Sequence, residues 1–371
     1  MRGIFPYIHQ KEGWPSFTWK SEELESLLAQ VRNIQGQLVG RMEVLDVELR
    51  GEADLETLTL DGLKSSEIEG ELLDVQQVRS SFAKRLGIHI KNSVYSERDV
   101  EGLADMIFDA TKNHSVQLTE NRLFGWHESL FSRGKSGLIK IKVGTWRTDS
   151  TGPMQLVSGA LGKEKVHFEA PASNRVAAEM KAFLKWFNAP QCIDPVFKAG
   201  LAHLWFVTIH PFEDGNGRIT RALTDLLLAK ADGLNQRFYS MSAQIRKERK
   251  AYYHILEKTQ QGSLDVTAWL HWFLNCLQKA IKTSNQTLEG VLFKHRFWNK
   301  HSTTILNKRQ GRMLAKLLEG FDGKLYSSKW AKMCKCSADT ALRDIQDLMK
   351  KGILQKEEAG GRSTNYELIK F

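Results

Sequence analysis

The sequence HPFEDGNGRITR, residues 210–221, is a charged and glycine-rich stretch set between two apolar runs. The run before it, residues 199–209, reads AGLAHLWFVTI, and the run that overlaps its end, residues 219–230, reads ITRALTDLLLAK. Apolar runs of this length predict two buried helices. The charged stretch is therefore predicted to be the turn that joins two core helices.

The glycines of this turn favour an anion site. Gly215 and Gly217 flank Asn216, so the backbone can adopt positive φ and direct its N–H groups toward one point. That point lies at the N-terminus of the second helix, where anions bind readily. Arg218 and Arg221, three residues apart, share one face of that helix and supply forked donors for phosphate oxygens.

Two further side chains of the turn add chemistry. His210 ends the first helix, and an imidazole with a pKa near 6.5 accepts a proton from an attacking hydroxyl at neutral pH. Asp214 supplies one carboxylate, the usual protein share of a Mg²⁺ ion whose other ligands are phosphates and water. The plainer interpretation is an ordinary turn with His210 as a helix C-cap. The combination of base, carboxylate, glycines and two arginines favours a functional site.

This stretch resembles the signature of the Fic family, His-x-Phe-x-Asp/Glu-Gly-Asn-Gly-Arg-x-x-Arg, at every defined position. The resemblance implies transfer of AMP from ATP to a hydroxyl of a Ser, Thr or Tyr in a target protein. It also implies that His210 deprotonates that hydroxyl and that Asp214 holds Mg²⁺ between the α- and β-phosphates. Relatives that act as kinases, such as the Doc toxins, carry Lys in place of the second glycine, so Gly217 favours nucleotidyl transfer.

The same resemblance assigns nucleotide-binding positions. The nest around Asn216 and the side chain of Arg218 would hold the phosphates, and Arg221 would meet the γ-phosphate. The full set of expected nucleotide-binding residues is Phe212, Glu213, Gly215, Asn216, Gly217, Arg218, Arg221 and Tyr253. Tyr253 enters because an aromatic residue in this region lies near the adenine in the family; a core-facing position for Tyr252 and Tyr253 is the alternative.

A second motif lies upstream, at residues 65–70 (SSEIEG). Alone, it would be only a capped, acidic helix end. Within a Fic-like chain it resembles the inhibitory motif Ser/Thr-x-x-x-Glu-Gly/Asn of the second class of the family. The resemblance implies that Glu69 pairs with Arg221 and misplaces the phosphates of bound ATP, that Ser65 anchors the segment by hydrogen bonding, and that Gly70 completes the motif.

Residues 154–157 and 165–169 predict two short strands around Gly159 and Gly162. Their place in the chain resembles the family's flap, whose edge binds a target segment as an added strand. Gly144-Thr145-Trp146-Arg147 resembles the Gly-x-Tyr/Trp-Arg that precedes the core in many relatives.

Apolar periodicity predicts one long amphipathic helix over residues 21–50 and a second helical stretch after Gly51. The long helix would pack within the chain or form the seam of a homodimer. Residues 243–258 predict a further single helix.

The C-terminal part of the chain holds most of its positive charge. The net charge is +10, and residues 295–371 carry sixteen Lys and Arg against eight Asp and Glu. Residues 308–319, 327–333 and 338–350 predict three helices, followed by strands at 352–354 and 366–369 around Arg362. This order resembles a winged helix-turn-helix with residues 339–350 in the recognition position. The basic excess fits DNA phosphates, whereas acid at Asp339, Asp344 and Asp347 leaves protein contact equally open.

Composition is that of a globular protein with 42% hydrophobic residues. No apolar run is long enough to span a membrane, and the N-terminus lacks the apolar core of a signal peptide, so a cytoplasmic location is expected. Four scattered cysteines, Cys192, Cys276, Cys334 and Cys336, predict neither disulfides nor a zinc site.

The sequence as a whole predicts a mainly α protein: an N-terminal helical segment (1–60), a Fic-like helical core with a β-hairpin flap (61–290) and a winged helix-turn-helix domain (300–371). The predicted function is an autoinhibited protein adenylyltransferase that uses ATP and Mg²⁺ and modifies itself. The alternatives are a DNA-binding transcriptional regulator whose Fic domain senses nucleotide, and an enzyme that removes AMP. The identity of the target protein lies beyond the sequence.

Overall fold

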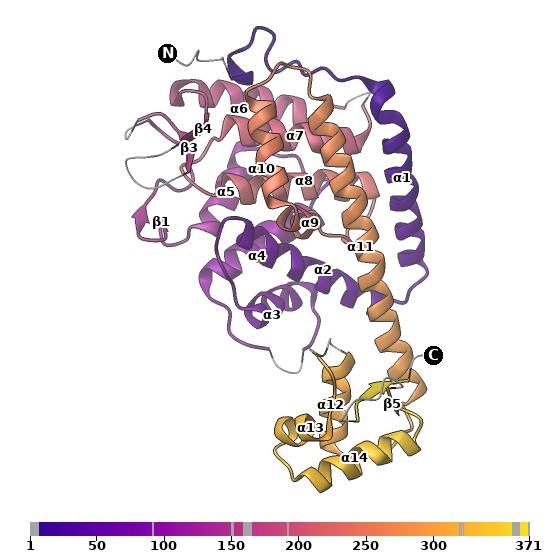
Figure 1. Ribbon diagram of the computed structural model, residues 1–371. Helices are drawn as coiled ribbons and strands as arrows, with labels where there is room; N and C mark the ends of the chain where they lie inside the picture. Colours follow the sequence, from indigo (N-terminus) through magenta and orange to yellow (C-terminus); the bar gives the residue numbers. More distant parts are fainter. Residues whose placement is uncertain are drawn as a thin grey trace. The chain divides into compact units, whose positions relative to one another are not determined.

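The computed structural model describes residues 7–90, 93–149, 152–158, 165–190, 193–318, 321, 323–357 and 364–369 (Figure 1). The chain divides into two compact units, residues 1–287 and 288–371. The predicted division between residues 60 and 61 falls inside a helix of the first unit, and residue 300 is the last residue of the helix in which the second unit begins.

The first unit is built from helices with two small hairpins. Its helices are a short 3₁₀ helix η1 (Ile8–Gln10), α1 (Ser21–Glu43), α2 (Val47–Ile68), α3 (Val75–Leu86), α4 (Arg98–Lys112), α5 (Glu120–Leu130), α6 (Ser173–Asn188), α7 (Pro195–Ile209), α8 (Asn216–Asp232), α9 (Met241–Lys247), α10 (Arg249–Gln260) and α11 (Thr267–Lys300), which continues into the second unit. The strands are β1 (Lys135–Ser136), β2 (Ile139–Lys140), β3 (Gln155–Ser158) and β4 (Lys165–Glu169).

Helices α7 and α8 pack along each other in the interior of the first unit (Figure 1). Nearly every residue of α7 is buried, as expected of a helix that is apolar on all sides. Asp194 caps its N-terminus by accepting a hydrogen bond from the Val196 N–H at 2.7 Å, and Pro195 occupies the first turn. Helix α8 ends at Gly233 in the left-handed conformation, with φ of 69°. The two predicted core helices are therefore present.

The prediction of one helix over residues 21–50 is wrong. Helix α1 ends at Glu43, and α2 starts at Val47. Asp46 stands between them and accepts a hydrogen bond from the Leu49 N–H at 2.8 Å, so its side chain satisfies a backbone donor that a continuous helix would bond internally. Gly51 consequently lies inside α2 instead of separating two helices.

A buried polar cluster fastens α2 to the segment that follows α8. The Arg237 guanidinium pairs with the Asp225 carboxylate of α8 at 2.9 Å, and the Arg237 backbone N–H donates to Asp54 of α2 at 3.0 Å. Asp61 of α2 accepts a hydrogen bond from the Ser240 hydroxyl. Buried charges require such partners, because an unpaired ion in the interior is costly. The cluster therefore fixes the position of α2 relative to α8.

The predicted helix over residues 243–258 is also divided. Helix α9 ends at Lys247 and α10 begins at Arg249, with Glu248 between them at φ −105°. The Glu248 carboxylate accepts hydrogen bonds from the Gln244 amide and from the Lys279 ammonium of α11, the latter at 2.7 Å. The break thus coincides with a contact to another helix. The spacing of apolar residues in the sequence gives no sign of such a contact.

Strands β3 and β4 form the expected antiparallel hairpin, shifted by one residue at β3. Leu156 pairs with Phe168 and Val157 with Val166, so His167 is the extra residue of a bulge. Gly159 and Gly162, on which the hairpin prediction rested, lie outside the described residues.

The second unit contains α12 (Lys308–Leu318), α13 (Ser327–Cys334), α14 (Ala338–Lys350), β5 (Leu354–Lys356) and β6 (Tyr366–Leu368). The strands pair antiparallel, and Leu325 adds a bridge to Tyr366. Trp330, Ile345 and Leu348 are fully buried in its core. The predicted strand at residues 352–354 starts only at Leu354, because Gly352 has φ of 68° and belongs to a turn. The winged helix assignment stays a prediction, and Arg362 lies outside the described residues.

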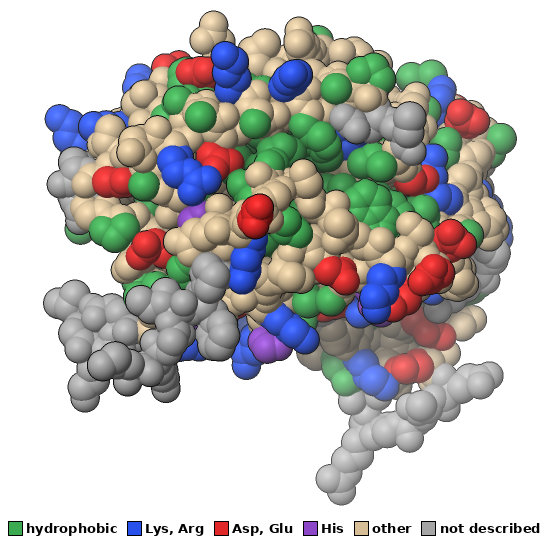
Figure 2. Space-filling view, turned by 90° about the horizontal axis from the view of Figure 1, so that it is seen from above, with side chains coloured by type: hydrophobic (Ala, Val, Ile, Leu, Met, Phe, Trp, Pro, Cys, Tyr) green, Lys and Arg blue, Asp and Glu red, His purple; other side chains and the backbone are tan. Residues whose placement is uncertain are grey.

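Surface charges of both signs are interspersed with hydrophobic side chains on the face that Figure 2 draws. Among the described residues, no helix combines the length and apolar character that crossing a bilayer requires. Cys276 is buried, Cys334 and Cys336 are partly buried, and all three are free thiols; Cys192 lies outside the described residues.

Candidate active site

The charged stretch turns sharply at His210, the C-cap of α7, which adopts the left-handed conformation with φ of 52°. A non-glycine residue reaches this region only when its surroundings hold it there. Arg147 supplies that support: its Nε donates to the His210 carbonyl at 2.7 Å, and its backbone N–H donates to the Pro211 carbonyl at 2.9 Å. The side chain also donates to the Pro171 carbonyl and pairs with Asp149 at 2.9 Å. Arg147 is therefore the positioning residue of the turn.

The rest of the turn is closed by Asn216. Its side-chain oxygen accepts from the Phe212 N–H at 2.9 Å, and its side-chain nitrogen donates to the Phe212 carbonyl at 2.8 Å. Gly215 has φ of 79°, and a Cβ there would lie 2.7 Å from the Phe131 ring. The Asn216 amide is thus committed to the backbone of the turn, while the first N–H groups of α8 have no carbonyl of their own helix to bind.

His127 of α5 supports the turn by contacts with Phe212 and Asp214. Its ring stacks on Phe212, with centroids 4.2 Å apart, and its Nε2 lies 3.2 Å from the Asp214 carbonyl. The Gly144 N–H points at its Nδ1 from 3.2 Å, so Nδ1 accepts and Nε2 donates. Burial lowers the pKa of His127 to about 4, which keeps this ring neutral.

The imidazole of His210 is also held neutral. Its Nδ1 lies 3.2 Å from the Val207 carbonyl, and because a carbonyl only accepts, Nδ1 carries the proton in this bond. Burial, aided by the Arg147 cation, lowers the pKa of His210 to about 4. The remaining nitrogen, Nε2, therefore carries a lone pair at neutral pH, as a general base requires.

Glu69, the C-cap of α2, lies against the N-terminus of α8. Its Oε1 is 2.8 Å from the Arg221 guanidinium, and a Cβ at Gly217 would lie 2.1 Å from the same oxygen. Ser65 holds the same guanidinium twice, through its hydroxyl and its carbonyl, each at 2.9 Å. Gly70 follows with φ of 90° and turns the chain away. The ion pair that the resemblance implies is thus present.

The second arginine of the turn is paired with the same upstream segment. Arg218 lies 2.8 Å from the Glu71 carboxylate, and its guanidinium carbon is 4.9 Å from the centre of the Phe131 ring. Because Arg218 is buried and Glu71 is about half exposed, this pair opens toward solvent.

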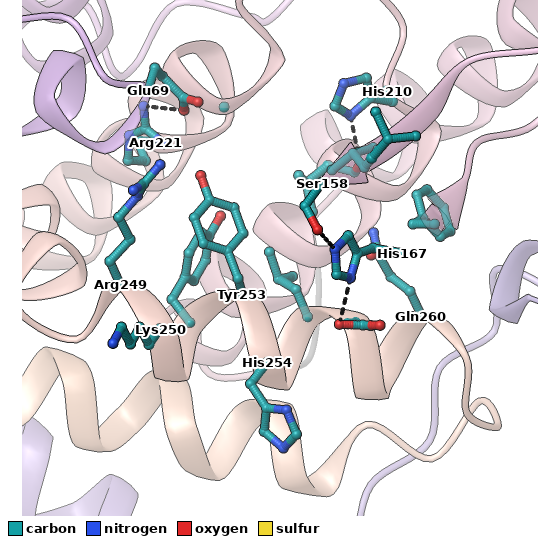
Figure 3. Close-up of a pocket in the computed structure, with 18 residues that line it drawn as sticks. Glu69, Ser158, His167, His210, Arg221, Arg249, Lys250, Tyr253, His254 and Gln260 are labelled. Carbon is teal, nitrogen blue, oxygen red and sulfur yellow. Dashed lines mark hydrogen bonds and ion pairs between the residues drawn. The ribbon is translucent and has the colours of Figure 1, made fainter. Parts of the chain in front are cut away.

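A cavity of about 610 Å³ opens beside this contact (Figure 3). Of the predicted site residues, His210, Gly217, Arg221, Tyr253 and Glu69 line it, whereas Phe212, Glu213, Asp214, Gly215, Asn216, Arg218, Ser65 and Gly70 do not. Its other walls come from β3, β4 and α10, which contribute Val157, His167, Leu256 and Gln260 among others. The cavity thus joins the His210 base to the α8 N-terminus.

The carboxylates of Glu213 and Asp214 do not line this cavity. Glu213 accepts from the Lys142 N–H at 2.9 Å and lines a different hollow near β2. Asp214 accepts from the Gly215 N–H at 2.5 Å and from the Ser136 hydroxyl. The described residues contain no cluster of three or more metal-ligating side chains. Asp214 is a single carboxylate, the kind of protein ligand that Mg²⁺ uses when phosphates and water supply the others.

The two tyrosines of α10 differ in burial and in hydrogen bonding. Tyr252 is buried, and its hydroxyl bonds the His203 ring at 2.9 Å. Tyr253 is 37% exposed and lies over the cavity, with the Arg249 guanidinium 5.3 Å from its ring centre. Tyr253 thus offers a ring face to a planar ligand group, which Tyr252 does not.

Several supporting residues escaped the sequence analysis. His127 and Ser136 carried no sequence signal, because their partners in the turn lie far away in the chain. Arg147 carried one, since it ends the quoted Gly144-Thr145-Trp146-Arg147 segment. Glu71 stands directly after the upstream motif, and its pairing with Arg218 could have been proposed by the same reasoning as that of Glu69.

The fold has solved counterparts. A Fic family protein from Desulfovibrio desulfuricans G20 superposes with a TM-score of 0.53 at 22% identity, covering 96% of this chain and 98% of that one. A Fic domain containing signaling protein from Bacteroides thetaiotaomicron VPI-5482 gives 0.52 at 19% identity, covering 70% and 97%. At these identities the likeness concerns the fold alone.

Sequence comparison identifies the family. Residues 117–228 match the Fic/DOC family, and residues 7–88 match a domain of unknown function, DUF4172. Curated relatives named protein adenylyltransferase Fic, from Drosophila erecta and Drosophila mojavensis, are 26% and 27% identical over 218 residues, or 58% of this chain. The match spans 39% and 38% of their own lengths. Residues 117–228 of this chain therefore form a Fic domain.

The buried environment of His210 makes a titration prediction. Because burial lowers the pKa of its imidazole to about 4, the ring should stay neutral at about pH 5 and gain its proton only near pH 4. The His210 Cε1 proton, assigned by comparison with His210→Gln, should report this in an NMR titration. A midpoint near 6.5, the value of a solvated imidazole, would contradict the described burial.

Proposed function

We propose that the protein is an autoinhibited protein adenylyltransferase that transfers AMP from ATP to a Ser, Thr or Tyr hydroxyl. The observation that carries the proposal is the contact of Glu69 with Arg221 at the N-terminus of α8, in the cavity that His210 also lines. A base, an anion site and a carboxylate that blocks it are the parts such an enzyme needs. The relatives named protein adenylyltransferase support the reaction type.

In this proposal His210 removes the proton of the target hydroxyl. Its Nδ1 stays bonded to the Val207 carbonyl, so the orientation of Nε2 is fixed before the target arrives. The backbone N–H groups at the start of α8, with Arg218 and Arg221, bind the phosphates. Asp214 is the residue that would hold Mg²⁺, which would offset the charge of the phosphates.

The inhibition follows from competition for one cation. While Glu69 occupies Arg221 and the space above Gly217, a γ-phosphate meets a carboxylate and the nucleotide is held out of line for attack. Ser65 keeps the guanidinium in place in both states, since it binds through its own hydroxyl and carbonyl. The inhibitory group is thus intramolecular and acts at every protein concentration.

The hairpin of β3 and β4 is the proposed docking edge for the target segment. Val157 and Val166 are exposed, at 51% and 40%, although both belong to a strand pair. A backbone added along this hairpin, roughly residues 154–169, would lie at the wall of the cavity. Such docking uses backbone hydrogen bonds and places few demands on the side chains of the target.

His210→Ala should abolish transfer from α-labelled ATP to proteins of a cell extract, in a Glu69→Gly background. Loss of a general base costs on the order of 10² to 10⁴ in rate. Nucleotide affinity, measured by calorimetry, should change only a few fold. Transfer of label from γ-labelled ATP in the parallel incubation would indicate a kinase and contradict adenylylation.

Glu69→Gly should strongly raise self-modification by α-labelled ATP, because it frees Arg221 for the γ-phosphate. Glu71→Gly is the matched control: it removes a neighbouring carboxylate that pairs with Arg218 outside the cavity, so its effect should be smaller. Adding Arg221→Ala to Glu69→Gly should cancel the gain. A Glu69→Gly protein no more active than wild type toward any hydroxyl would refute the autoinhibition.

A second candidate function is DNA binding by the second unit. It is favoured because two of the acidic residues on α14 are bonded to other residues of the unit. Asp344 is buried and bonds Arg309 at 2.7 Å and Asn307 at 2.8 Å, and Asp347 bonds Gln310 at 2.8 Å. The carboxylates of Asp344 and Asp347 are thus engaged within the unit. The exposed positions of α14 are Ala338, Asp339, Leu342, Arg343, Gln346 and Lys350.

This candidate predicts a salt-dependent affinity for a DNA duplex, with log affinity falling linearly with log salt. The double variant Arg343→Glu, Lys350→Glu should weaken binding and flatten the salt slope by about 1 for each DNA phosphate that these side chains neutralise. Lys316→Glu, a comparable charge reversal on the exposed face of α12, is the control and should act weakly. Absence of binding at low salt would leave the unit as a protein-contact module.

A further inference from the structure

A serine of the flap lies in the cavity beside a histidine and a glutamate. Ser158, the last residue of β3, has its hydroxyl 2.5 Å from Nε2 of His167, and Nδ1 of His167 is 3.0 Å from the Glu257 carboxylate of α10 (Figure 3). All three side chains line the same cavity as His210 and Arg221. In the view of Figure 3, Ser158 lies between His167 and His210.

The order of these bonds sets which atom can take the proton of Ser158. The Glu257 carboxylate only accepts, so Nδ1 of His167 carries a proton, and in the form of the ring with a single proton Nε2 accepts the proton of the Ser158 hydroxyl. Burial tends to raise the pKa of Glu257, but the bonds from His167 and Lys165 outweigh it and lower the pKa, so the carboxylate stays charged. This is the arrangement that activates a hydroxyl as a nucleophile.

The flap is tied to α10 at this point. Lys165 Nζ lies 3.4 Å from the Glu257 carboxylate, and the Gln261 amide donates to the His167 carbonyl at 2.9 Å. The bulge in β4 makes His167 the extra residue, which frees its ring from the regular cross-strand pairing and turns it toward Ser158 and Glu257. The three groups are therefore positioned by a strand irregularity together with a helix contact.

The other hydroxyls of the cavity are less suited to react as nucleophiles. Among the described residues that line it, Ser158, Tyr252 and Tyr253 bear hydroxyl groups. The Tyr252 hydroxyl is buried and bonded to His203. Burial, together with the Glu69 charge, raises the pKa of Tyr253, which disfavours its ionised form. Ser158 is exposed and has a proton acceptor in contact.

We propose that Ser158 is the chain's own acceptor of AMP, with His167 as its base and Glu257 as the partner of that base; this rests on the adenylyltransferase function proposed above. The Ser158 O–H bond breaks and its proton passes to Nε2 of His167. The oxygen forms a bond to the α-phosphorus of ATP, and the bond from that phosphorus to the bridging oxygen breaks. Pyrophosphate leaves with the electron pair.

This assignment gives the cavity two bases with separate acceptors. His167 contacts Ser158, whereas Nε2 of His210 is left for the hydroxyl of another protein. Self-modification at Ser158 and transfer to other proteins should consequently respond to different substitutions. A modified Ser158 would also place a nucleotide on the flap where the target segment docks.

The test uses the full chain with Glu69→Gly, incubated with Mg²⁺, α-labelled ATP and a cell extract. Label at Ser158 is located by peptide mass spectrometry and compared with label on the extract proteins. Ser158→Ala should remove the labelled flap peptide, whereas Ser26→Ala, which removes an exposed hydroxyl of α1, should not. His167→Gln should lower the ratio of Ser158 label to extract label at least tenfold, and His210→Ala should raise it.

Glu257→Gln is the second variant, and it should lower the same ratio by weakening the support of a protonated His167. Equal falls of both labels in His167→Gln and Glu257→Gln would show that these residues only hold the flap, which overturns the proposed base. Label at other positions of the chain with Ser158 unlabelled would overturn the acceptor while leaving adenylylation intact. Absence of α label on both chain and extract would overturn the adenylyltransferase itself and this inference with it.

Discussion

The Arg221 guanidinium is a nearly buried cation, and a cation in that position needs an anionic partner in every state of the protein. It is 2% exposed, and a charge left alone in such a place is strongly unfavourable. Ser65 accepts two of its hydrogen bonds, and Glu69 supplies the carboxylate that pairs with it. In the proposed function, a protein carboxylate and a nucleotide phosphate are alternatives for this site, which would link the end of α2 to the chemistry at the start of α8.

The surrounding fold keeps that site rigid. Arg147 and Asn216 hold the turn from two sides, and His127 supports it by stacking on Phe212. Helix α2 is anchored along its length by the buried cluster around Arg237, so the segment that carries Glu69 is part of the core. In the proposed function, release of the Glu69 carboxylate would have to come from its own side chain or from the last turn of α2, because moving the whole helix would expose buried charges.

The features that could be predicted from the sequence are those that depend on residues close together in the chain. The apolar runs around residue 210 indicated α7 and α8, and the glycines indicated the turn. The helix break at Asp46 was missed, because apolar periodicity runs through a position whose capping role depends on one side-chain bond. His127 could not be assigned, since its partner is distant in the chain, and the segment that ends at Arg147 carried a signal without naming the bonds that Arg147 makes. Pairing of Glu69 with Arg221 came from family resemblance rather than from spacing.

Gly217 leaves the space beside α8 that the Glu69 carboxylate occupies. A Cβ at this position would lie 2.1 Å from the Glu69 oxygen, so a side chain here and an inhibitory carboxylate compete for one volume. A lysine at this position would displace the Glu69 carboxylate from its place beside Arg221 whether or not a nucleotide is bound. A bulky side chain at residue 217 and the contact of Glu69 with Arg221 therefore exclude each other, so one substitution far along the chain from residue 69 is enough to undo that contact.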